Sequence, residues 1–194
     1  IGDKPFPLCR GGFNTYLAAM TATDPRSFLY RDTLDPAAAA RLTADALAAA
    51  DGGALYLQYR KSEAFGFDDG RHKTASYDTH SGFGLRAVSG EMTAFAHANE
   101  LSEAAIRRAA ETMALIGPSK DAKAPPPQGT NHHHYTDADP LDLVPFADKV
   151  NLCQSIDAAA RARDPRVAQV SVGLSGTWSV VEIVRPDGFI ATDV

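Results

Sequence analysis

Residues 54–98 read ALYLQYRKSEAFGFDDGRHKTASYDTHSGFGLRAVSGEMTAFAHA, and this stretch decides the fold. From Leu55 to Phe67 apolar and polar side chains alternate, which is the two-residue period of a strand with one buried face. Asp69-Gly70 then predicts a hairpin turn, because glycine readily adopts a positive φ angle. Three further strands are expected, at 71–79, 82–88 and 92–97. Four consecutive strands joined by short turns predict an antiparallel meander.

Helices are expected on both sides of this meander. Asp35 and Pro36 form a typical helix start, and the alanine-rich run that follows extends to Ala50 before Gly52-Gly53 ends it. Ser102 is the expected N-cap of a second helix, which Gly117-Pro118 stops. The predicted buried stripe of that helix consists of Ile106, Ala109, Ala110, Met113 and Ile116.

The last part of the chain predicts one more helix and a second meander. Apolar residues at spacings of three and four indicate a helix that ends before Asp164-Pro165. These residues are Leu143, Phe146, Val150, Cys153, Ile156 and Ala160. Strands follow at 166–175, 178–185 and 189–194, with Gly176 between the first two. Because helices and strands do not alternate as βαβ units, the expected class is α+β, with antiparallel meander sheets covered by three helices.

Composition divides the chain into four parts. Residues 1–33 are an irregular lead-in, and residues 34–117 hold a helix, the four-stranded meander and a second helix. Residues 118–145 form a linker rich in proline and histidine. Residues 146–194 complete the same N-terminal domain with the last helix and the three-stranded meander.

The composition of the 194 residues excludes several classes of protein. A formal net charge of −5 argues against direct nucleic-acid binding, which needs a concentrated basic surface. No window approaches the run of about 18 apolar residues that a membrane-spanning helix needs. Cys9 and Cys153 lie far apart without metal-ligand spacing, which favours reduced thiols and a cytoplasmic protein. Because the chain begins without methionine and stops after a predicted strand, we expect a piece of a longer protein.

Three groups of residues could carry chemistry, and each also has a structural explanation. His132-His133-His134 could bind a metal ion, but adjacent side chains of an extended segment diverge, so a solvated loop is favoured. Gly82-Phe83-Gly84-Leu85-Arg86-Ala87 matches a dinucleotide-binding pattern, yet no helix is expected after it. The carboxylates around the first hairpin specify no metal cage and fit turn chemistry and charged strand edges. They are Glu63, Asp68, Asp69 and Asp78.

The sequence contains no recognisable catalytic motif. It has no G-x-S-x-G, HExxH or HExxxH pattern, and Cys153 is expected on a buried helical stripe. We therefore predict no catalytic residue and no metal ligand within residues 1–194. On its residue chemistry the segment is a scaffold or a binding domain.

The stretch from Leu55 to Ile116 resembles the N-terminal domain of the TldD/PmbA family, the modulators of DNA gyrase that are now regarded as zinc metallopeptidases. The motifs that carry this resemblance are Asp69-Gly70-Arg71-His72-Lys73, Gly82-Phe83-Gly84-Leu85-Arg86-Ala87-Val88-Ser89-Gly90-Glu91, Thr93-Ala94-Phe95-Ala96 and Leu101-Ser102. A second block consists of Asp164-Pro165-Arg166-Val167, Leu174-Ser175-Gly176, Asp187-Gly188 and Asp193-Val194. Ala94 departs from the family, which often has glycine there.

The resemblance implies a two-domain protein whose C-terminal half, absent from this segment, bears an HExxxH helix and a cysteine ligand for zinc. It implies a cytoplasmic peptidase that acts on unfolded or short peptides as a homodimer or as a heterodimer with a TldE/PmbA-like partner. This segment would contribute to the substrate chamber and to dimerisation, and it would be inactive alone. Neither nucleic acid nor a membrane is an expected partner.

Peptide binding is expected on the strands at 82–88 and 92–97. Glycines there would let another backbone approach closely, so that an extended peptide could bind by strand addition. The candidate peptide-binding residues are Gly82, Gly84, Arg86, Gly90 and Phe95. Two alternatives stay open. One is a protein-interaction module that modulates DNA gyrase or its regulators without peptidase activity, and the other is a metal-binding histidine loop at 132–134.

Overall fold

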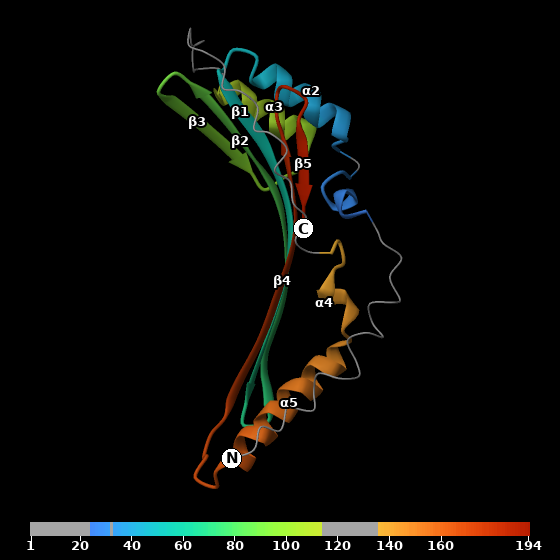
Figure 1. Ribbon diagram of the computed structural model, residues 1–194, viewed down its shortest axis with the longest axis vertical. Coiled ribbons are helices and arrows are strands. Elements are labelled where there is room, and N and C mark those ends of the chain that lie inside the picture. The colour runs from blue at the N-terminus through green and yellow to red at the C-terminus, as the bar shows by residue number, and fades with distance from the viewer. Residues whose placement is uncertain (1–23, 32, 114–135) are drawn as a thin grey trace. The chain divides into compact units, whose positions relative to one another are not determined.

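The computed structural model describes residues 24–31, 33–113 and 136–194, and Figure 1 shows their helices and strands. The helices are the 3-10 turn η2 (Pro25–Phe28), α2 (Pro36–Ala46), α3 (Glu103–Met113), α4 (Pro140–Leu143) and α5 (Phe146–Arg163). The strands are β1 (Gly52–Asp68), β2 (Arg71–Ser89), β3 (Met92–Ala98), β4 (Ser171–Val184) and β5 (Ile190–Asp193). They form one antiparallel sheet in the order β3-β2-β1-β4-β5, which confirms the α+β class.

Two pairs of predicted strands are single strands. β2 runs unbroken from Arg71 to Ser89, and β4 from Ser171 to Val184. The breaks expected between 79 and 82 and at Gly176 are therefore wrong. A Cβ on Gly176 would lie 2.6 Å from Cδ2 of Leu141, so this glycine admits Leu141 against a continuous strand instead of turning the chain. Pairing of β1 with β4 joins the two expected meanders into one sheet.

The turn and the helix caps that were predicted from residues close in sequence are present in the structure. Asp69 and Gly70 have φ angles of 49° and 69° in the turn between β1 and β2. The Asp35 carboxylate accepts a hydrogen bond from the Ala38 N–H at 2.8 Å at the start of α2. Before α3, Ser102 Oγ accepts one from the Ala105 N–H at 3.2 Å. Local geometry thus confirms one predicted turn and both predicted caps.

The third predicted helix consists of the separate helices α4 and α5. Pro140 is the first residue of α4, and Pro145 lies between α4 and α5. Because proline has no N–H to donate, Pro145 separates the two helices. Cys153 is 1% exposed as expected, but Phe146 and Ile156 on the same predicted stripe are 54% and 39% exposed. The prediction is wrong for these two positions, because the cluster that packs on α5 around Cys153 is small: it holds Phe65, Phe67 and Val172.

Some predictions lie outside the described residues. They concern most of the lead-in at 1–33, the end of the second helix with Ile116, and the linker up to residue 135, including the histidine run. None of the helices in the described ranges is both long and apolar enough to cross a membrane.

The chain forms two compact units, to which β1, β2 and β4 each contribute residues. Among the described residues, unit 1 consists of 62–77 and 137–178, and unit 2 consists of 24–31, 33–61, 78–113, 136 and 179–194. In unit 2, α3 packs on both α2 and β3. The largest completely buried apolar side chains of unit 2 are Leu29, Leu55, Leu57, Leu85, Ile106, Val180 and Val184.

Unit 2 also buries a charged side chain. Glu182 is 0% exposed, and its carboxylate accepts hydrogen bonds from Arg26 Nε and Thr192 Oγ1, both at 2.7 Å, and from the Tyr30 hydroxyl. Burial and the adjacent carboxylate raise the pKa of Tyr30 well above its ordinary value. This cluster links η2 to β4 and β5, because Arg26 belongs to η2, Glu182 to β4 and Thr192 to β5.

Candidate functional site

The sheet of unit 2 has one covered face and one open face. Leu55 and Leu57 are completely buried, whereas Tyr56 between them is 38% exposed, as the alternation of a strand requires. α2 and α3 lie against one face of the sheet (Figure 1). On the other face Phe95 is 64% exposed, and no helix among the described residues of unit 2 covers it.

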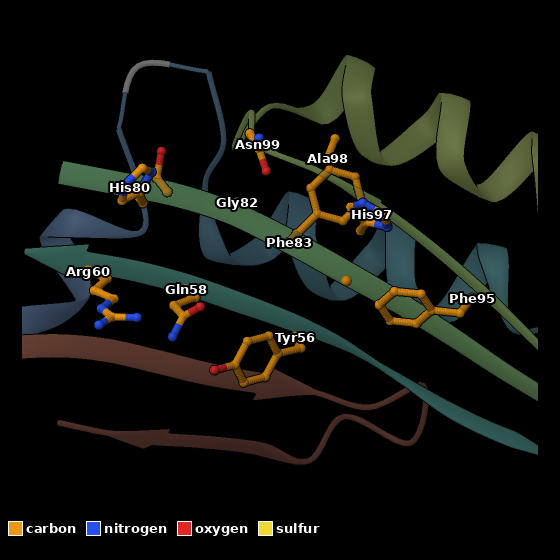
Figure 2. A pocket seen from close by; sticks show the side chains of 12 residues that line it. Tyr56, Gln58, Arg60, His80, Gly82, Phe83, Phe95, His97, Ala98 and Asn99 are labelled. Carbon is orange, nitrogen blue, oxygen red and sulfur yellow. The ribbon is translucent and has the colours of Figure 1, made fainter. Parts of the chain in front are cut away.

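The open face contains a hollow over β2. Its volume is about 530 Å³, and Figure 2 shows the side chains around it. Tyr56, Gln58 and Arg60 come from β1, and Phe95 and His97 come from β3. Because all these residues belong to unit 2, the hollow is a feature of that unit alone.

Two glycines of β2 form the floor of the hollow. A Cβ on Gly84 would lie 3.0 Å from two ring carbons of Phe95, so the missing side chain makes room for this ring. A Cβ on Gly82 would lie 2.6 Å from the carbonyl oxygen of Ala98, so at this position the backbone of the same chain makes the close approach. The Phe95 ring and the Ala98 carbonyl therefore occupy the space that side chains at positions 84 and 82 would take.

The walls of the hollow are aromatic and basic. The ring of Phe95 stacks on His97, with centroids 5.7 Å apart and ring planes at 27°. Such exposed rings offer apolar surface to a ligand. The ionisable side chains of the wall are Arg60, His80 and His97, with the phenol of Tyr56. No carboxylate occurs among the lining residues, all of which the structure describes.

Three of the predicted peptide-binding residues, Gly82, Gly84 and Phe95, line the hollow. Arg86 pairs with Phe95 in the register of β2 and β3 and is exposed, but it lies outside the lining residues. The structure therefore brings three of these candidates together and places Arg86 beside them.

Gly90, the fifth candidate, belongs to the turn between β2 and β3. Its φ angle is 59°, which favours glycine, and its N–H donates a hydrogen bond to Asp51 Oδ2 at 2.7 Å. Gly90 shapes the turn and does not line the hollow.

Sequence reasoning missed the residues that β1 and the histidines contribute. Tyr56, Gln58 and Arg60 occupy the polar positions of the alternating pattern, so their common face could have been predicted. The predicted hairpins pair β1 with β2 and β2 with β3, but without a fixed register they do not show that this face meets His80 and His97.

The other sequence candidates have structural roles. Glu63 pairs with Lys149 at 2.7 Å, and Asp69 pairs with Arg161. Asp68 accepts hydrogen bonds from Gln169 and Ser171, which hold the pKa of its carboxyl below the ordinary value. These contacts support the structural interpretation of the three carboxylates. The glycine pattern at 82–87 lies inside β2 and leads into another turn, so it does not form a dinucleotide-binding loop.

The described residues do not fit a catalytic metal. They contain no group of three or more histidine, cysteine, aspartate or glutamate side chains that could hold an ion. His80 and His97 line the hollow without a third ligand. Cys153 is buried, and burial raises the pKa of its thiol, which disfavours the thiolate that binds metals. No step of a metal-dependent reaction can be derived from these residues.

Two family models match the chain. The model described as PmbA/TldA metallopeptidase domain 1 matches residues 53–117, which include β1, β2, β3 and the hollow. The model described as PmbA/TldA metallopeptidase central domain matches residues 139–194, which include α4, α5, β4 and β5.

Curated proteins are similar to most of this chain. The Metalloprotease TldD homolog of Haemophilus influenzae is 34% identical over 144 residues, which are 72% of this chain and 30% of that protein. The chain thus spans about 30% of the length of that curated relative.

Solved structures share the fold at low sequence identity. A protein of Bacteroides thetaiotaomicron named as a modulator of DNA gyrase has a TM-score of 0.58 at 14% identity, over 80% of this chain and 37% of that one. TldE of Thermococcus kodakarensis has a TM-score of 0.56 at 15% identity, with the same shares covered.

Proposed function

Because this chain belongs to the PmbA/TldD metallopeptidase family, we propose that it is the N-terminal part of a TldD-like zinc-dependent peptidase that acts on unfolded or short peptides. Its role is to bind the peptide and to contribute to the substrate chamber and to the dimer. Residues outside 1–194 carry out the hydrolysis. The relative from Haemophilus influenzae, which is named a metalloprotease, supports the peptidase activity.

The open face of unit 2 carries this proposal. A ligand enters a hollow best where few side chains obstruct it, and Gly82 and Gly84 add no side chains to the hollow beside Phe95. β3 is the first strand of the sheet order, so its outer edge has no strand partner in the described part of the chain. Strand addition at that edge would supply main-chain hydrogen bonds to one segment of the peptide, and the next segment would cross the open face and place its side chains in the hollow.

Zinc binding and assembly belong to the intact protein in this proposal. The zinc ligands lie in the C-terminal half of the intact protein, as the family resemblance implies. The partner is a second copy or a TldE-like protein, and the name of the similar structure from Thermococcus kodakarensis supports the second choice. We place the protein in the cytoplasm. Light scattering of the intact protein, alone and mixed with a TldE-like protein, would distinguish the two assemblies.

Two glycine substitutions in the intact protein test the peptide-binding role. Gly84→Leu fills the hollow and should lower kcat/KM for an unstructured peptide about tenfold, chiefly by raising KM. Gly173→Leu is the matched control, because a Cβ on Gly173 has no atom within 4 Å and this residue lies on β4 outside the hollow. It should leave kcat/KM unchanged.

Folding and binding can be separated in this test. Because Leu at position 84 must displace the Phe95 ring, Phe95→Ala serves as a second variant that removes contact area without crowding. It should also raise KM. Unchanged KM in both variants, with native circular dichroism spectra, would overturn the role of this face.

A further inference from the structure

The hollow of unit 2 differs in charge from the rest of the chain. The chain has 24 acidic and 19 Lys and Arg residues, yet the hollow is lined by Arg60 and by no carboxylate. Arg86 adds another basic group on the same face, opposite Phe95. The nearest carboxylate along β2 is Asp78, two residues before His80 and outside the lining residues. Such a local excess of positive charge attracts carboxylates.

The hollow also has an aromatic end and a basic end. Figure 2 shows Arg60 and His80 at one end and Phe95 at the other. Along β1, Tyr56 and Arg60 are four residues apart on one face, which corresponds to about 13 Å of extended chain. An extended peptide has the same rise, so its side chains at positions i and i+4 match this separation. Side chains three positions apart point to opposite faces of the peptide.

We propose that the hollow selects extended peptide segments in which an aromatic or large apolar residue and a Glu or Asp are four positions apart. The inference rests on the proposed function and specifies its substrate class. The apolar side chain packs beside Tyr56 and Phe95, and the carboxylate pairs with Arg60, so the two contacts have the spacing of Tyr56 and Arg60. Arg60 is exposed, and its five N–H donors can bind this carboxylate in addition to its contact within the chain.

Fluorescein-labelled nonapeptides test this selection on the intact protein. One peptide carries a central Phe with Glu four positions away on both sides, so that either chain direction can bind. A second has Gln in place of Glu, and a third has Glu three positions from Phe. Initial anisotropy, read before cleavage, should show the first peptide binding about three- to tenfold more tightly than the other two. About 0.5 M NaCl should reduce this advantage, because salt screens charge pairs.

Arg60→Gln should remove the difference between the Glu and Gln peptides, and Arg71→Gln should preserve it. Arg71 is the matched control because it is exposed on β2 but belongs to unit 1. Equal affinity for the Glu and Gln peptides, or equal affinity for Glu at three and four positions, overturns the selection. If Phe95→Ala still weakens the binding of every peptide in that case, the proposed function stands. If Phe95→Ala weakens the binding of no peptide, the peptide-binding role of this face fails as well.

Discussion

Units 1 and 2 share the strands β1, β2 and β4, but they are stabilised in different ways. In unit 2 the helices α2 and α3 cover the sheet, and side chains such as Leu57 and Leu85 are 0% exposed. In unit 1 the apolar cluster is small, and residues 71–77 of β2 are exposed throughout. Because burial against a packed layer stabilises a strand, we expect the parts of these strands in unit 2 to be more stable than the parts in unit 1.

Polar contacts supply part of what unit 1 lacks in apolar burial. Lys149 is 8% exposed, and its Nζ donates to both carboxylate oxygens of Glu63 and to the carbonyl of Leu141, each at 2.7 Å. These bonds hold α4 and α5 to β1 within unit 1. Apolar substitutions should therefore affect unit 2 most, and within unit 1 loss of the Lys149–Glu63 pair should cost more than loss of an exposed ion pair.

The largest expected effect is on the core of unit 2. Leu57→Ala leaves a cavity at a completely buried position and should lower the free energy of unfolding by about 3 kcal/mol. Val150→Ala, at a partly buried position of unit 1, should cost about 1 kcal/mol. Native-state hydrogen exchange of amides in β1 and α5 would measure both. A loss at Leu57 no greater than that at Val150 would contradict the comparison.

The second effect concerns the ion pair of unit 1. Lys149→Met leaves the mostly buried Glu63 carboxylate without its partner and should lower the free energy of unfolding by about 2 kcal/mol. The double variant Lys149→Met/Glu63→Met should recover at least half of this loss, since no unpaired charge remains. Arg166→Met breaks an exposed pair with Asp164 and should cause no measurable change in urea denaturation. Equal losses in the single and double variants would refute the polar explanation.

The third prediction follows the reactivity of Cys153. Its thiol is buried within unit 1 and has a raised pKa, so iodoacetamide should alkylate it at least about tenfold more slowly than in the unfolded chain. Cys9→Ser leaves Cys153 as the one cysteine of the chain. Adding Lys149→Met should accelerate the alkylation of Cys153, because both residues belong to unit 1. Leu57→Ala changes unit 2, so it should accelerate this alkylation less if the two units open separately. Mass spectrometry over time would follow the modification.

The smallest expected effect is a pH dependence in unit 1. Hydrogen bonds from Gln169 and Ser171 make the pKa of Asp68 lower in the folded than in the unfolded chain. The stabilisation is therefore present above the unfolded value of about 3.9 and is lost as pH falls through the folded value. Asp68→Asn should make urea unfolding less sensitive to pH below about pH 4. An unchanged acid dependence would show that these bonds contribute nothing measurable.

Much of the fold could be predicted because its signals are local. Asp35 and Ser102 cap their helices through N–H groups three residues away, and Gly70 turns the chain where the alternation stops. The same reasoning failed at Gly176, because the side chain that explains this glycine, Leu141, is distant in sequence. The exposed positions Phe146 and Ile156 were missed for a related reason: spacing shows which side chains share a helix face but does not show how much partner surface that face meets.

The candidate site shows the same division between local and distant information. By itself the sequence determined the two faces of β1, the caps at Asp35 and Ser102, the turn at Asp69-Gly70, the net negative charge and the family resemblance. These depend on residue types and on spacings of a few residues. Only the tertiary structure decided that β1 pairs with β4, that Phe95 lies over Gly84, and that Arg60 and His97 line one hollow. Such pairings join residues far apart in the chain, and their register follows from the packing of the whole sheet against its helices.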